Sequence, residues 1–108
     1  MALVFSLLAS AQDRVAHNSI QEIVWSDRSL EIVGTEKPSF TSFQLTDPPR
    51  LVIDIAEAVL GDAPKSLNIR EAHVVSMQAT SFGSSSGSIA RIVLTFDADV
   101  ESDLVRRD

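Results

Sequence analysis

Residues 43–55 read FQLTDPPRLVIDI, and this stretch decides the fold class of the chain. Thr46 to Pro49 is a turn signal, because an aspartate that can bond its own backbone precedes two prolines of restricted φ. After the turn, apolar residues recur at every second position, which is the spacing of a strand with one buried face. The residues predicted to face the core are Leu51, Ile53 and Ile55. The residues predicted to face away from it are Arg50, Val52 and Asp54.

A second stretch, ARIVLTFD at residues 90–97, repeats the order of an arginine, an aliphatic strand and an aspartate. The residues predicted to face the core here are Ile92, Leu94 and Phe96, with Arg91, Val93 and Thr95 on the other face. The low-complexity segment 83–88 precedes this strand and is predicted to be a solvated hairpin tip.

The rest of the chain from Ser19 onward alternates short apolar stretches with turn signals, the pattern of a sandwich or barrel. No segment sustains the period of a long helix, and residues 56–60 are predicted to form one short helical turn or a loop. In residues 73–82 we expect Val75, Met77 and Ala79 to share a face. Other strands are predicted within residues 20–25, 30–34, 39–45, 67–69 and 100–105. The prediction is an all-β fold, a small β-sandwich of two short, mostly antiparallel sheets.

Composition limits the function. The chain has 108 residues, which suits one domain, and a net charge of −6, which argues against nucleic acid and against a polybasic membrane patch. It contains no cysteine, so neither a disulfide nor a thiolate metal site can form. The cationic residues are mostly arginine, whose planar guanidinium pairs carboxylates in bidentate fashion.

The first eleven residues, MALVFSLLASA, are apolar and end in small residues. Three interpretations compete: the remnant of a secretory leader, a wrongly assigned start codon, or a strand or short helix of the fold. We favour the leader, which divides the chain into a leader remnant or linker at 1–17 and a β domain at 18–108.

In order along the chain, Phe43, Pro49-Arg50, residues 51–54, 75–82 and 91–94 resemble the pattern of the AMIN domain. The resemblance covers about residues 18–106. It implies a non-catalytic β-sandwich that binds peptidoglycan in the periplasm, as part of an outer-membrane or cell-envelope protein. The parent would be a type IV pilus secretin, hence a homo-oligomer with pilus-assembly partners, or else a periplasmic N-acetylmuramoyl-L-alanine amidase. Members of the family usually have a further final strand, so we expect this chain to lack it and to leave an edge unpaired.

Four residues are the candidate peptidoglycan-binding residues: Arg50, Asp54, Arg91 and Phe82. In the functional interpretation, the two guanidinium groups bind the carboxylates of stem peptides and Asp54 orients one of them. In the structural interpretation, Asp54 pairs with Arg50 or Arg91 across strands. An exposed aromatic ring near Arg91 would suit a glycan strand, but large aromatic residues usually belong to the core, and we expect this of Trp25 and Phe82.

Catalytic, metal and cofactor sites are not indicated. His17 and His73 are far apart and lack the spacing of a zinc ligand set, so both are expected at the surface. No nucleophile elbow is present, and Asp97 with Asp99 is interpreted as a solvated pair. The alternative function is a protein–protein interaction module that docks another envelope component along an exposed strand edge.

Overall fold

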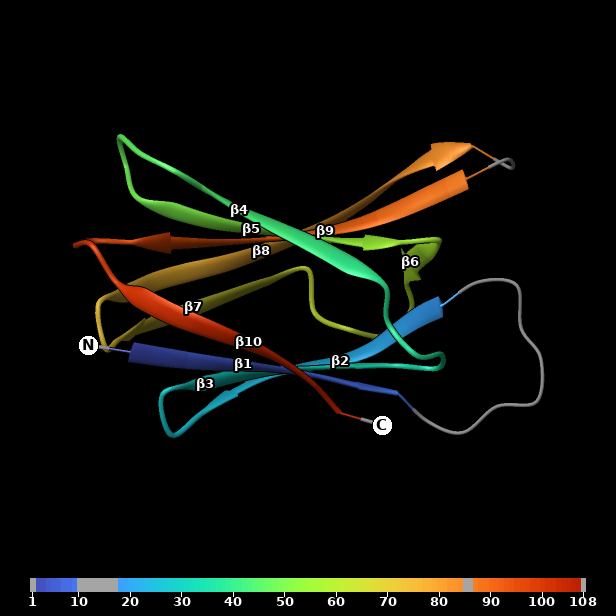
Figure 1. The fold of residues 1–108 in the computed structure, drawn as a ribbon, viewed down its shortest axis with the longest axis horizontal. Helices are drawn as coiled ribbons and strands as arrows, with labels where there is room; N and C mark the ends of the chain where they lie inside the picture. Colours follow the sequence, from blue (N-terminus) through green and yellow to red (C-terminus); the bar gives the residue numbers. More distant parts are fainter. Residues whose placement is uncertain (1, 10–17, 85–86, 108) are drawn as a thin grey trace.

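The two hydrophobic stretches form neighbouring strands of one sheet, which packs against a second sheet (Figure 1). The computed structural model of the protein describes residues 2–9, 18–84 and 87–107. Sheet A consists, in spatial order, of β10 (Glu101–Arg107), β1 (Ala2–Ala9), β3 (Ser29–Gly34), β2 (Asn18–Ser26) and β6 (Ala58–Leu60). Sheet B consists, in spatial order, of β4 (Phe40–Leu45), β5 (Arg50–Ala56), β9 (Gly87–Phe96), β8 (Val74–Ser84) and β7 (Ser66–Glu71). The all-β sandwich predicted from the sequence is confirmed.

Sheet B is antiparallel throughout, and its register follows from the alternation in β5 and β9. Leu51 pairs with Leu94 and Ile53 with Ile92, so the apolar faces of both strands point toward sheet A. All four side chains are at most 3 % exposed. The predicted core faces of the two stretches are therefore confirmed.

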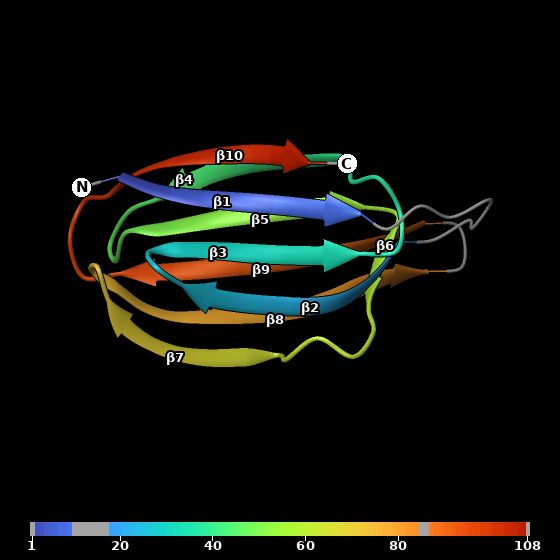
Figure 2. The ribbon, with the colours of Figure 1, turned by 90° about the horizontal axis from the view of Figure 1, so that it is seen from below.

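The core lies between the two layers. The strand axes of the two sheets are roughly aligned when viewed through sheet A (Figure 2). Each sheet contributes its inward face, as in other aligned sandwiches. The largest fully buried side chains are Phe5, Ile20, Leu30, Ile32, Ile53, Ile55, Met77, Ile92, Leu94 and Val74.

Local chemistry explains the connections. Asp27 and Arg28 both have positive φ, of 51° and 63°, and make the two-residue turn between β2 and β3. The segment predicted as a helical turn or a loop instead forms the short strand β6, parallel to β2. Val75 is the extra residue of a β-bulge, because Val74 pairs with Phe96 and Ser76 with Thr95. The prediction that Val75 shares a face with Met77 was wrong, since Val74 is the buried residue.

Residues 2–9 form β1 in the interior of sheet A, parallel to both β3 and β10. Phe5 lies opposite Leu30 on one side and Leu104 on the other, and its side chain is completely buried. This arrangement matches the interpretation of the segment as a strand of the fold. The first strand of sheet A along the chain is therefore Ala2–Ala9. The division of the chain into 1–17 and 18–108 remains a prediction from the sequence.

Candidate functional site

The outer face of sheet B, the face turned away from sheet A, carries the predicted binding residues. Thr41, Asp54, Arg91 and Thr80 lie opposite one another on β4, β5, β9 and β8. They form one polar row across the sheet because each is out of phase with the buried residues beside it. Which arginine Asp54 can reach therefore depends on the register between β5 and β9, and not only on the spacing of Arg50 and Asp54 within β5.

Asp54 and Arg91 form a bidentate ion pair in the middle of this row. Arg91 Nε donates to Asp54 Oδ1 at 2.8 Å, and Arg91 Nη2 donates to Asp54 Oδ2 at 2.9 Å. The side chain of Asp54 is 16 % exposed and that of Arg91 is 39 % exposed. The hydrogen bonds from the guanidinium lower the pKa of the Asp54 carboxyl below its ordinary value and raise the pKa of Arg91. Two charges on this face therefore neutralise each other.

Two phenylalanines flank the guanidinium of Arg91. Its Cζ lies over both rings, 5.8 Å from the centre of the Phe43 ring and 5.3 Å from the centre of the Phe82 ring. These are cation–π distances. Phe43 on β4 is 41 % exposed and Phe82 on β8 is 47 % exposed. Phe43, Arg91, Phe82 and Asp54 together are called the Phe–Arg cluster below.

Arg50 lies apart from this cluster. It stands opposite Thr95 and Leu45, and its Nε donates to the Pro48 carbonyl oxygen at 3.2 Å. Its Nη2 is 3.5 Å from the Thr46 carbonyl oxygen. The Arg50 side chain thus bonds the turn between β4 and β5, and it is Arg91 that bonds Asp54.

Comparison with known families supports the sequence resemblance. A family model, that of the AMIN domain, matches residues 22–107. This chain belongs to the AMIN domain family. AMIN domains are non-catalytic, peptidoglycan-binding modules of periplasmic envelope proteins. Neither the curated proteins nor the solved structures contain a match to the chain.

The aromatic residues of this AMIN domain differ in their exposure to solvent. Phe82 is exposed on the outer face of sheet B, so its predicted place in the core was wrong. Trp25 packs partly against the core, as expected, and its Nε1 donates to Glu71 Oε1 at 2.6 Å. Phe43 was not among the binding residues predicted from the sequence, although its two-residue spacing from Leu45 places both side chains on one face of an edge strand.

His73 Nδ1 lies 2.9 Å from Asp97 Oδ1, and both side chains are at least half exposed. His17 falls outside the described residues, as do Ser85 and Ser86 of the predicted hairpin tip. In the ranges that the structure describes, no group of three or more His, Cys, Asp or Glu side chains is arranged to hold a metal ion. Nor does this part of the chain contain a helix that is long and apolar enough to cross a membrane.

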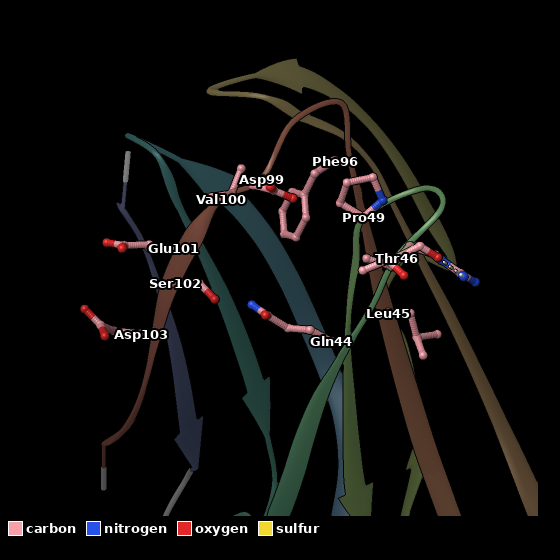
Figure 3. Close-up of a pocket in the computed structure, with 11 residues that line it drawn as sticks. Gln44, Leu45, Thr46, Pro49, Phe96, Asp99, Val100, Glu101, Ser102 and Asp103 are labelled. Carbon is pink, nitrogen blue, oxygen red and sulfur yellow. Dashed lines mark hydrogen bonds between the residues drawn. The ribbon is translucent and has the colours of Figure 1, made fainter.

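A cleft of about 800 Å³ separates the edges of the two sheets where β4 faces β10. Figure 3 shows Gln44 of β4 and Ser102 of β10 pointing toward each other across it, while Glu101 and Asp103 point away. Farther along the two strands, Arg106 of β10 lies over the ring of Phe40 of β4 at 5.5 Å. The cleft thus opens beside β4, an edge strand of sheet B. Among the strands that the structure describes, none pairs with the outer backbone edge of β4.

Proposed function

We propose that this AMIN domain binds peptidoglycan through the outer face of sheet B. The observation that supports this site is the Phe–Arg cluster, in which two exposed phenylalanines flank a guanidinium that is paired with Asp54. Aromatic side chains exposed together are uncommon away from interaction surfaces. Burial of the two rings would have stabilised the folded state, so their exposure points to a ligand.

The test is sedimentation with purified sacculi. The wild-type protein is expected to pellet with them, and a Phe43→Ser, Phe82→Ser double variant is expected to remain mostly in the supernatant. Both side chains are more than 40 % exposed, so the double variant should keep its fold. Val24→Ser is the matched control, because Val24 is 43 % exposed on β2 of the other sheet.

Three outcomes separate the parts of this proposal. A wild-type protein that stays in the supernatant contradicts peptidoglycan binding by this domain. A double variant that pellets like the wild type places the binding site elsewhere on the domain. Loss of pelleting in the Val24→Ser control shows that the loss in the double variant is not specific to sheet B, and the site proposal then fails.

We propose a type IV pilus secretin of the outer membrane as the parent protein, with a wall amidase as the alternative. The resemblance of residues 38–41 to the secretin versions of the domain supports the first. In a homo-oligomeric secretin, many copies of a weakly binding domain act together and raise the overall affinity. The sequence of the complete gene tests this proposal, because a secretin domain or an amidase domain would be recognised directly.

A second function is favoured by the edge strand β4. Residues 41–45 are all exposed, and β4 contains neither a charged residue nor a proline, the usual protections of an edge. A strand of another envelope or pilus-assembly protein would fit beside β4, next to the cleft. A photo-crosslinking residue at Gln44 is then expected to capture an envelope-assembly protein in cells, and one at Val24 is not. Equal capture at the two positions would contradict this function.

A further inference from the structure

We infer that the outer face of sheet B binds the glycan strand of peptidoglycan, with uncharged sugar rings stacked on Phe43 and Phe82, rather than the carboxylates of stem peptides. This inference rests on the proposed function and adds to it the chemical class of the bound group.

The first argument is the state of Arg91. Its Nε and Nη2 donate to both carboxylate oxygens of Asp54, at 2.8 and 2.9 Å. A second carboxylate would have to share the guanidinium with Asp54 and would meet the repulsion of a like charge. Asp54 is only 16 % exposed, so it cannot leave the pair without burying an uncompensated charge. Arg91 is therefore poorly suited to bind an anionic ligand.

Arg50 does not replace Arg91 in this role. Its Nε donates to the Pro48 carbonyl oxygen at 3.2 Å, which directs the guanidinium to the turn between β4 and β5. The chain as a whole has a net charge of −6, which repels an acidic peptide at a distance. The charges thus favour a ligand without net charge.

The second argument is the pair of aromatic rings. Phe43 is on β4 and Phe82 is on β8, so that β5 and β9 lie between them in sheet B. Both rings lie beside the same guanidinium. The ion pair of Arg91 with Asp54 holds the guanidinium in place, and each of the two rings lies within cation–π distance of it. Sugar rings present apolar C–H groups that pack on aromatic faces, and successive sugars of a strand would reach the two rings in turn.

The third argument is the polar row between the rings. Thr41 and Thr80 stand at its two ends, opposite Asp54 and Arg91, and both are exposed. Their hydroxyl groups can both donate and accept hydrogen bonds. The hydroxyl and acetamido groups along the edge of a glycan strand have the same double capacity. Aromatic rings flanking a row in which two threonine hydroxyl groups border an internally neutralised ion pair match an uncharged, amphipathic saccharide.

The experiment compares two probes of peptidoglycan in solution. One is glycan strands from which an amidase has removed the stem peptides, with the lactyl carboxylate that this frees on each N-acetylmuramic acid converted to an amide so that the strands stay uncharged. The other is the free stem pentapeptide. Binding of each to the wild-type protein is measured by calorimetry, alongside sedimentation with intact sacculi. We expect the stripped strands to bind at least about tenfold more tightly than the pentapeptide, which corresponds to about 1.4 kcal/mol.

Substitutions and salt then identify the contact. Phe43→Leu with Phe82→Leu keeps apolar side chains but removes the rings, and it is expected to weaken strand binding by about tenfold or more. Phe82→Trp, which keeps an aromatic face, is expected to retain binding. Raising NaCl from about 0.05 to about 0.5 M should change strand affinity by less than about twofold, because salt weakens charge pairs and not ring stacking.

The outcomes distinguish this inference from the function on which it rests. If intact sacculi pellet the protein but stripped strands do not bind, the inference is overturned and the proposed function stands. Tighter binding of the pentapeptide, or strand affinity that falls steeply with salt, also overturns it. Failure of intact sacculi to pellet the protein overturns both.

Discussion

Replacement of Phe5 by alanine tests whether the first strand belongs to the folded domain. The Phe5 side chain is completely buried between Leu30 and Leu104, in a strand with neighbours on both sides. Val4, the preceding residue, is 37 % exposed and provides the matched control. If residues 1–17 were a leader remnant, neither substitution would change the stability of the rest of the protein.

The magnitude follows from burial. Truncating a fully buried phenylalanine removes its transfer free energy and leaves a cavity, at a cost of about 3–5 kcal/mol. A domain of this size has a free energy of unfolding of about 5–15 kcal/mol, so this is a large fraction of the total. Val4→Ala removes fewer and partly solvated atoms, and its expected cost is about 1 kcal/mol or less.

Equilibrium unfolding in urea measures the difference. Trp25 is the only tryptophan and packs partly against the core, so its fluorescence reports loss of the sandwich. With an m value of roughly 1.5 kcal/mol/M, the midpoint of Phe5→Ala should fall by about 2–3 M. A Phe5→Ala midpoint equal to that of Val4→Ala, or to that of the wild type, would refute the place of Phe5 in the core.

Three further predictions concern the sheets. Ile53→Ala in the centre of β5 is expected to cost about 2–5 kcal/mol, measured by urea unfolding, because Ile53 has no exposed surface. Gly34→Ala would make its Cβ clash with Asn18 Oδ1, and displacing this buried side chain should cost about 1–3 kcal/mol. The same substitution should cost much less in an Asn18→Ala background, and equal costs would exclude this clash. Asp54→Asn should remove one part of the acid sensitivity. The folded pKa of Asp54 lies below 3.8, so its pairing with Arg91 stabilises the fold above that pH, and this stabilisation is lost as the pH falls through the folded pKa. Urea midpoints at about pH 7 and about pH 2.5 should therefore differ more in the wild type than in the variant.

The fold was predictable where one strand face is strongly apolar. Leu51 and Ile53, with Leu94 and Ile92 opposite them, could be assigned to the core because a slip by one residue would expose all of them. Val75 was misassigned because the bulge after Val74 inverts the alternation, and nothing in the residue types of 73–82 marks its place.

The candidate site was predictable only in part. Spacing placed Asp54 on an outward face, but only the register between β5 and β9 shows that its partner is Arg91 and not Arg50. Phe82 resembled a core residue because phenylalanine is usually buried. Residues 1–11 remained ambiguous for a related reason, since a buried strand and the apolar region of a leader have the same composition.

The parallel pairing of β1 with β10 determines how the domain would respond to tension. Ala2 lies opposite Glu101 at one end of this pair, and Leu8 lies opposite Arg107 at the other. A pull applied between Ala2 and Arg107 would drive the two strands past each other along their length, so their backbone hydrogen bonds would resist in shear, all together. A peptidoglycan-binding domain pulled at its two ends would benefit from such a connection, because hydrogen bonds loaded at once hold far greater force than hydrogen bonds opened one after another.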